Sequence, residues 1–176
     1  MSQALLVVDV QVNMVVGQYA VPNAEQFLQK FEQRILEARK NGQDVIWVQN
    51  DGPEDDVDEP FSEGWQLYFE PVEGDRVIRK TTQNVFESNP RLAAELKADG
   101  IDSLELIGMQ SEYCVQASAR GAKAAGFEVV LQPELHATFH DGTPATNFTT
   151  DYKVSATDLA AQVYAGLVAD GTLSER

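Results

Sequence analysis

The sequence holds one cysteine, Cys114, and two histidines, and its 28 acidic residues outnumber the 13 basic ones. A lone cysteine excludes a disulfide within the chain. The net charge of −15 repels phosphate backbones, so neither nucleic acid nor an anionic membrane suits the protein as a partner. We see no secretory signal and no apolar run of about 18 residues, so we expect no membrane span and a reducing, cytoplasmic location.

What is present is an ordinary globular balance. Hydrophobic residues make up 43% of the 176 positions and charged residues 23%, which is enough apolar surface for a buried core. No internal repeat, low-complexity segment or linker rich in Pro, Gly or Ser divides the chain. Residues 1–176 are therefore expected to form a single domain.

Short apolar runs alternate with segments that carry apolar residues at helical spacing. The run "ALLVVDV" at 4–10 is typical of a strand buried on both faces. The other predicted strands are 44–49, 76–80, 103–108 and 128–131. The predicted helices are 23–42, 89–100, 111–126 and 155–171, and in the first of them Asn23 can cap the start and Gly42 the end. This order predicts an α/β fold, a three-layer αβα sandwich around a mostly parallel, Rossmann-like sheet of five to six strands.

Polar residues stand where the predicted strands end. In a parallel sheet the ligand site lies outside the carboxyl ends of the strands, so these residues are expected to meet at one rim. They are Asp9, Asn50, Asp51, Lys80, Gln110 to Cys114, Glu134 and His136.

Three of these residues could act together. Asp9 follows the apolar "LLVV", and a buried carboxylate needs a partner, for which Lys80 is the obvious candidate. A thiol at a helix N-terminus and near an ammonium has a lowered pKa and becomes nucleophilic, which is what we expect of Cys114. Structural alternatives stay open: a lone cysteine is usually a small buried hydrophobe, an aspartate after a first parallel strand is often a cap or a phosphate-site residue, and a lone lysine is usually solvated.

Two stretches of the sequence carry a family likeness. "LLVVDVQ" has an aspartate with a glutamine two residues on, and residues 76–131 have a lysine followed by an aromatic (Phe86), a strand glycine (Gly108), Cys-Val and an Ala-rich helix ending in Gly-aromatic. Together these resemble the motifs of the isochorismatase-like cysteine hydrolase superfamily, which includes nicotinamidases, N-carbamoyl amide hydrolases and isochorismatases. The likeness extends to about residue 140.

The resemblance implies a role for each matched residue. Asp9 would be the general base, Lys80 an orienting cation and Cys114 the nucleophile. A non-proline cis peptide would fall at Met109–Gln110 and aim the amides of Gln110 and Cys114 at an oxyanion. The implied reaction is hydrolysis of a small amide or carbamoyl C–N bond through a thioester. Similar proteins often assemble, so a homo-oligomer, a dimer or larger, is expected.

Candidates to contact the small-molecule substrate lie near the same rim. For the aromatic ones, packing in a core or an interface is the alternative. The candidates are Gln11, Asn50, Trp65, Tyr68, Phe86 and Tyr113.

The sequence departs from nicotinamidases, which carry metal-binding Asp and His residues after the second strand. Here that region reads "WVQNDGPEDDVDEPF", and Asn50 and Asp51 are poor replacements, so we expect no catalytic metal and no cofactor. His136 and His140 in "HATFH" could bind a metal on a helix, but the Asp-Gly that follows favours a turn.

Three further features concern the surroundings of the thiol. Region 51–63 has seven acidic residues and no basic one, which predicts a solvated loop or, alternatively, a lid that repels anionic substrates. Glu112 would oppose a thiolate if it pointed inward, so we expect it to face solvent or pair with Arg120. Segment 141–158 resembles the family least and is a candidate to close the pocket of a neighbouring subunit.

Other functions are open on the sequence alone. The main alternative is a non-hydrolytic pseudoenzyme or small-molecule binding protein of the same fold, against which the presence of all three triad residue types counts. A phospho-receiver would need an aspartate at the end of the third strand, where "RVIRK" offers none. A thiol redox role would need a partner thiol from outside the chain.

Overall fold

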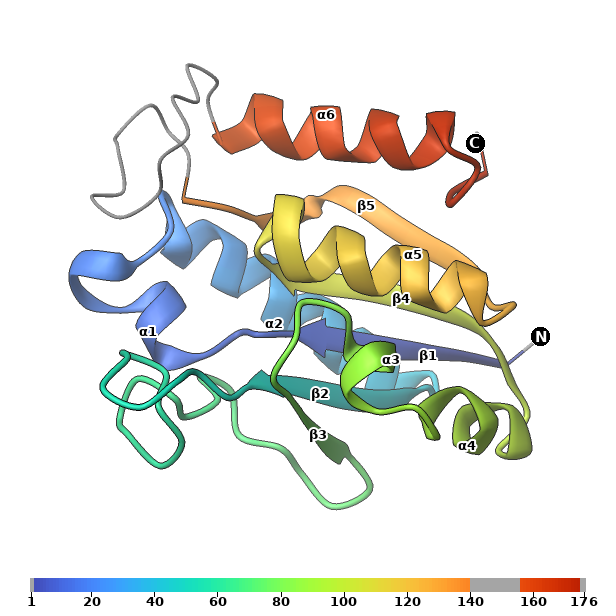
Figure 1. Cartoon of the computed structure of the whole chain (residues 1–176), viewed down its shortest axis with the longest axis horizontal. Helices are drawn as coiled ribbons and strands as arrows, with labels where there is room; N and C mark the ends of the chain where they lie inside the picture. The colour runs from blue at the N-terminus through green and yellow to red at the C-terminus, as the bar shows by residue number, and fades with distance from the viewer. Residues whose placement is uncertain (1, 140–155, 175–176) are drawn as a thin grey trace.

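The computed structural model describes residues 2–139 and 156–174. Within them five strands form one sheet in the order β3-β2-β1-β4-β5, and every neighbouring pair is parallel. The strands are β1 (Ser2–Val8), β2 (Asp44–Asn50), β3 (Arg76–Lys80), β4 (Ile101–Met109) and β5 (Glu128–Ala137). The predicted parallel α/β sandwich is thereby confirmed (Figure 1).

Helices cover both faces of the sheet (Figure 1). One face packs against α2 (Ala24–Lys40), and the other carries α3 (Val85–Ser88), α4 (Leu92–Ala98), α5 (Gln116–Ala124) and α6 (Ala156–Ala169). Three short turns complete the described elements: α1 (Val12–Val15) and the 3-10 turn η1 (Gly17–Tyr19), which follow β1, and the π-helical turn η2 (Ser111–Val115), which follows β4.

Strand β1 shows why this sheet needs a layer on each side. Leu5 and Val7 belong to the core on the α2 side, whereas Leu6 and Val8 belong to the core beneath α4 and α5. All four side chains are fully buried. Because successive side chains of a strand point to opposite faces, an unbroken apolar run is buried only when both faces are covered.

Helix α2 begins and ends near the predicted residues, but its start lacks the predicted side-chain cap. Gly42 has φ +67°, its N–H donates to Arg39 O at 3.1 Å, and the Gln43 N–H donates to Ala38 O at 2.9 Å. These two bonds form a Schellman motif, which closes the helix at a left-handed glycine. Asn23 occupies the N-cap position, but it adopts a left-handed conformation and its side chain makes no capping hydrogen bond, so the prediction that it caps the helix is wrong.

Strand β5 is longer than the predicted segment 128–131. Pairing with β4 holds as far as Leu131, shifts register, and resumes at His136. Pro133 falls in the shifted part, where its missing N–H breaks no ladder bond, as is common on an edge strand. The prediction that Glu134 and His136 follow the strand is therefore wrong, because both lie within it.

The strand order reverses beside β1. Strands β2 and β3 lie on one side of β1, and β4 and β5 lie on the other. At such a reversal a crevice opens beyond the carboxyl ends of the two flanking strands. Here β1 and β4 approach closely. Gly108 has φ +121°, and a Cβ on it would lie 2.1 Å from Val8 O. Only glycine fits at this point of the rim.

Candidate active site

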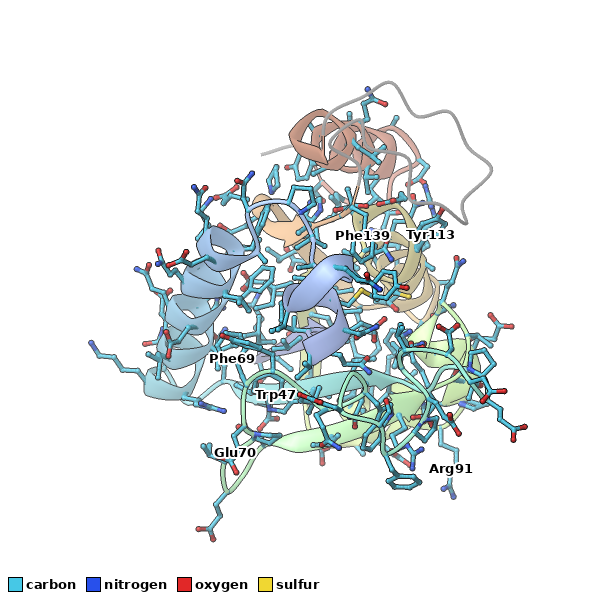
Figure 2. All side chains as sticks on the ribbon, turned by 90° about the vertical axis from the view of Figure 1, so that its left-hand side faces the viewer. Trp47, Phe69, Glu70, Arg91, Tyr113 and Phe139 are labelled. Atoms are coloured by element: carbon cyan, nitrogen blue, oxygen red, sulfur yellow. The ribbon has the colours of Figure 1, made fainter. Side chains whose placement is uncertain are left out.

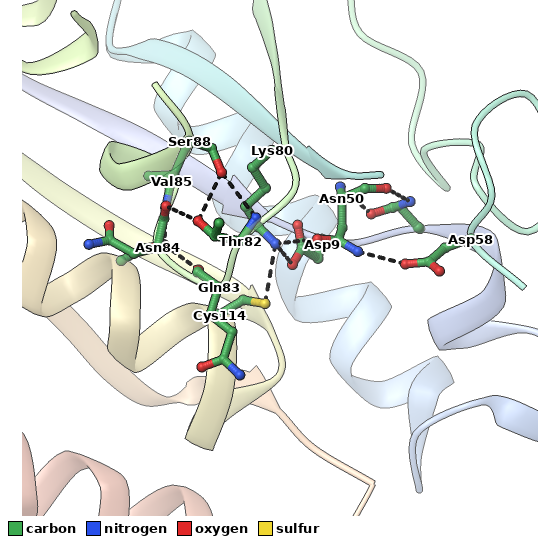
Figure 3. A network of polar contacts seen from close by, with 12 residues as sticks. Asp9, Asn50, Asp58, Lys80, Thr82, Gln83, Asn84, Val85, Ser88 and Cys114 are labelled. Carbon is green, nitrogen blue, oxygen red and sulfur yellow. Dashed lines mark hydrogen bonds and ion pairs between the residues drawn. The ribbon is translucent and has the colours of Figure 1, made fainter. Parts of the chain in front are cut away.

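Three side chains meet beyond the carboxyl ends of β1, β3 and β4 (Figure 3). Lys80 Nζ lies 2.8 Å from Asp9 Oδ2 and 3.2 Å from Cys114 Sγ. Asp9 and Lys80 are each 1% exposed, so their ion pair is shielded from water. Asp9 has φ +50°, a left-handed conformation that aspartate tolerates better than most residues. The structure therefore brings together the three residues that the resemblance named as base, cation and nucleophile.

The thiol sits in a tightly built turn. The peptide bond Met109–Gln110 is cis, at the bond named from the sequence. Gln110 O accepts hydrogen bonds from the N–H groups of Tyr113, at 3.1 Å, and Val115, at 3.2 Å. These bonds fold η2 back on Gln110 and place Cys114 in the turn that directly precedes α5.

Burial sets the protonation of this site. Burial, followed by the neighbouring Asp9 carboxylate, raises the pKa of Cys114 to about 12, although Lys80 acts in the opposite direction. The predicted lowering of the thiol pKa is therefore wrong. Burial also raises the pKa of Asp9, against the pull of Lys80. For Lys80, burial disfavours the ammonium, but Asp9 and Cys114 outweigh it and the pKa is raised. The resting site is a neutral thiol beside an ion pair.

The amide side chains of Gln11 and Asn50 are engaged by the protein itself. Asn50 Oδ1 accepts from Lys80 Nζ at 2.7 Å, and Asn50 Nδ2 donates to Asp58 Oδ2 at 2.7 Å. Gln11 Oε1 accepts from the Asn50 N–H at 2.7 Å, and Gln11 Nε2 donates to the carbonyl oxygens of Asn50 and Trp65. Both side chains therefore link the segments that meet at the carboxyl ends of the strands.

Trp65 lies at the rim in a polar setting. Its Nε1–H donates to Asp51 Oδ1 at 2.8 Å, and the Arg79 guanidinium lies 5.1 Å from its ring. Arg79 also forms an ion pair with Asp51 at 2.9 Å. Trp65 is half-buried, and Tyr68, three residues on, is exposed. Trp65 is thus held in place by Asp51, which directly follows β2, and by Arg79 in β3.

The other two aromatic candidates differ in position. The Phe86 ring lies 6.0 Å from the Phe127 ring and packs against the core on the α5 side, so its contacts are those of a packing residue. Tyr113 lies in η2, directly before Cys114, and is half-buried. Figure 2 looks onto the carboxyl ends of the strands and shows Tyr113 and Phe139 on that face.

Glu112 does not follow the sequence prediction. It is 9% exposed, and its Oε1 accepts from Thr138 Oγ1 at 2.6 Å. Arg120 instead bonds Asp170 and Gln116, each at 2.8 Å. The expectation that Glu112 faces solvent or pairs with Arg120 is therefore wrong. The reason is the greater length of β5, which carries the chain over η2 and puts Thr138 beside Glu112.

Two buried polar contacts were missed from the sequence. Asp58 is buried, although residues 53–57 of the same acidic loop are exposed. Ser111 Oγ lies 2.8 Å from His136 Nδ1, and both side chains are fully buried. Burial lowers the pKa of His136 to about 4, so the ring is neutral near pH 7. No spacing signal pairs Ser111 with His136, because they lie on different elements 25 residues apart.

Two negative findings apply to residues 2–139 and 156–174. No group of three or more His, Cys, Asp or Glu side chains there is arranged to hold a metal ion. No helix in that part of the chain is long and apolar enough to cross a bilayer. His140 and nearly all of the candidate closing segment 141–158 lie outside the described residues.

Fold and site together define a parallel α/β protein in which a buried Asp9–Lys80 pair contacts the partly buried Cys114 thiol at the reversal of the strand order. The profile of the isochorismatase domain matches residues 3–160, so the chain belongs to the isochorismatase family. This confirms the resemblance seen in the sequence.

Particular relatives refine the comparison. Streptothricin hydrolase from Streptomyces noursei is 42% identical over 139 residues, which cover 78% of this chain and 55% of that protein. The chain thus spans about half the length of the first curated relatives that it matches. Among solved structures, an isochorismatase family protein aligns with a TM-score of 0.80 and 26% identity, covering 97% of this chain and 95% of that one. N-carbamoylsarcosine amidase from Thermoplasma acidophilum aligns with a TM-score of 0.71 and 26% identity, over 78% and 85%.

Proposed function

We propose that the protein is a cysteine hydrolase that cleaves a small amide or carbamoyl C–N bond, with Cys114 as nucleophile, Asp9 as base and Lys80 as orienting cation. The observation that carries this proposal is the contact of one ammonium group with both Asp9 Oδ2, at 2.8 Å, and Cys114 Sγ, at 3.2 Å. A thiol, a carboxylate and a cation within such reach are what covalent catalysis of acyl transfer needs. The hydrolase and amidase names of two similar proteins support the choice of bond.

Because the pKa of Cys114 is raised, attack and deprotonation go together. Asp9 takes the thiol proton as the S–C bond forms, and the carbonyl π electrons move onto oxygen. The amide N–H groups of Gln110 and Cys114 donate to that oxyanion. When it collapses, the C–N bond breaks and Asp9 gives its proton to the leaving nitrogen.

Deacylation uses the same groups in the reverse sense. Water gives a proton to Asp9 and attacks the thioester, the C–S bond breaks, and the proton returns from Asp9 to sulfur. The products are an amine or ammonia and a carboxylic acid, or a carbamic acid from a carbamoyl substrate. The ammonium of Lys80, whose pKa is raised, stays charged and stabilises the negative charge that develops on sulfur as the thiol proton leaves and as the thioester breaks.

Only some of the residues predicted to contact substrate stay candidates for that role. Trp65 and Tyr113 are half-buried on the rim and stay candidates for contact with substrate. Gln11 and Asn50 act by bracing the rim, and Phe86 acts by packing. A homo-oligomer in the cytoplasm stays part of the proposal, and sedimentation analysis tests the first half of it.

The experiment is a turnover screen. Streptothricin, N-carbamoylsarcosine and simple carboxamides are incubated with the protein, amine or ammonia release is followed, and intact mass spectrometry looks for an acyl group on Cys114. We expect Cys114→Ala to abolish release and Asp9→Asn to lower kcat about 10²–10⁴-fold. The exposed Glu54→Gln is the control and should leave release unchanged. Binding of these compounds by calorimetry, with no release and no acyl adduct, would establish the non-hydrolytic binding protein instead.

A further inference from the structure

The ammonium of Lys80 has three hydrogens and three acceptors. Besides Asp9 and Cys114 it contacts Asn50 Oδ1, at 2.7 Å, which is the shortest of the three contacts (Figure 3). This third acceptor is neutral. It fixes the direction of the ammonium group without adding a negative charge that would compete with Asp9 for the cation.

The orientation of the Asn50 amide is fixed by its second partner. An ammonium can only donate and an ionised carboxylate can only accept, so Asn50 must turn its oxygen to Lys80 and its NH₂ to Asp58. The Nδ2–Oδ2 distance to Asp58 is 2.7 Å. Asp58 thus selects which end of the amide meets the cation.

The backbone around Asp58 is built to hold that carboxylate in place. Gly52 N–H donates to Asp58 O at 2.9 Å, and a Cβ at Gly52 would lie 1.9 Å from Asp58 Oδ1. A second glycine, Gly64, closes the loop where a Cβ would lie 2.1 Å from Val57 O. The acidic loop therefore places one carboxylate inward while residues 53–57 face solvent.

We propose that Asn50 and Asp58 are positioning residues which hold the Lys80 ammonium between Asp9 and Cys114, and that the acidic loop acts in the reaction through this pair. The proposal rests on the proposed function for its catalytic meaning. It gives Asn50 a role towards Lys80 in place of a contact with substrate. The charged or titratable groups that face one another here are Asp9, Lys80, Cys114 and Asp58.

The test exchanges the two side-chain types. Asn50→Asp keeps an acceptor for Lys80 but sets two carboxylates against each other, and we expect the rate constant for iodoacetamide alkylation of Cys114 at pH 9 to fall about tenfold, with a similar fall in kcat. Adding Asp58→Asn restores a donor opposite the new carboxylate. The double variant Asn50→Asp/Asp58→Asn should therefore recover at least about fivefold of each rate over Asn50→Asp alone.

The control is Asn50→Asp combined with Glu54→Gln, which removes the same charge from an exposed position of the same loop. Equal recovery by Glu54→Gln, or a double variant no faster than Asn50→Asp, would overturn the proposal. If Asn50→Asp does not fold, Asp58→Asn alone decides: it should lower kcat and the alkylation rate about threefold with KM and the melting midpoint unchanged, because the amide can now turn over. No change in either rate would overturn the proposal.

The two readouts separate this proposal from the proposed function. Alkylation needs no substrate, so it reports on Lys80 and Cys114 even in a protein that hydrolyses nothing. Recovery of alkylation without turnover of any amide would contradict the hydrolase and leave the positioning pair standing. Turnover by the wild type with no recovery in the double variant would support the hydrolase and contradict the positioning pair.

Discussion

Lys80 Nζ lies 3.2 Å from Cys114 Sγ, although Lys80 ends the edge strand β3 and Cys114 follows β4, with β2 and β1 between them. The contact spans the reversal of strand order and brings the buried Lys80 ammonium next to the Cys114 thiol. Burial and Asp9 still hold the thiol in its neutral form, because together they raise the pKa of Cys114 more than Lys80 lowers it. The reactivity of the Cys114 thiol in the folded protein therefore follows from the balance between these three effects on its pKa.

The first prediction concerns the pH dependence of thiol alkylation. With a pKa of about 12, Cys114 in the folded protein should react with iodoacetamide at a rate that keeps rising from pH 7 to pH 10. The same cysteine in guanidinium-unfolded protein should level off above a pKa of about 8.5. The two profiles are measured by mass spectrometry of quenched samples. A plateau below pH 9 in the folded protein would contradict the assigned environment.

The buried ion pair should show strong coupling in stability. Asp9→Asn or Lys80→Met leaves one buried charge without its partner, so each should lower the free energy of unfolding by about 3–5 kcal/mol. The double variant should cost clearly less than the sum of the two. Urea unfolding gives all three values. As a control, Asp99→Asn removes an acid from the half-exposed pair with Arg76 and should cost less than about 1 kcal/mol.

Gly108 and Gly100 form a matched pair of variants that tests the close approach of β1 and β4 at the site. Both have positive φ, +121° and +81°, but a Cβ meets Val8 O at 2.1 Å only at Gly108 and open space at Gly100. Gly100→Ala should cost about 1–2 kcal/mol through backbone strain alone. Gly108→Ala should cost more than about 4 kcal/mol or prevent folding. Similar melting midpoints for the two variants would refute the close approach of β1 and β4.

His136 should make stability depend on pH. Burial lowers its pKa to about 4 from an unfolded value of 6.5, so between these values the unfolded chain binds a proton that the folded chain does not. The free energy of unfolding therefore falls as pH falls through this window, by up to about 3 kcal/mol. His136→Asn removes this contribution. The stability gap between wild type and variant should narrow from pH 7 to pH 4.5 in urea titrations, whereas a constant gap would contradict the assignment.

The convergence of Asp9, Lys80 and Cys114 was open to sequence reasoning, because a parallel sheet brings all strand carboxyl ends to one rim. Each residue stands at the end of a predicted strand or a few residues beyond one. The fold class followed from the same alternation. Strand ends were less certain, as β5 shows, since the predicted strand ended at Leu131 whereas the edge strand continues through Pro133 in a shifted register.

The sequence did not predict the protonation state of Cys114 or the hydrogen bonds that Asp58 and Glu112 make around the site. The direction of the Cys114 pKa depends on how much water reaches the thiol, and no residue pattern records that. Asp58 looks like its solvated neighbours in sequence, and only the close approach of Gly52 and the donor on Asn50 distinguish it. Glu112 was misplaced for a similar reason, because its partner Thr138 lies on a segment whose path could not be foreseen.

The strand order has a consequence for how the chain reaches its native state. Asp9, Lys80 and the turn with Cys114 come into contact only after β1 has paired with β2 and β4, and β2 with β3. Such parallel pairings join distant parts of the chain and form slowly. Before they form, Cys114 is an ordinary solvated thiol, and afterwards it is shielded and protonated. In a refolding experiment, the loss of thiol reactivity would time the completion of the sheet with no added label.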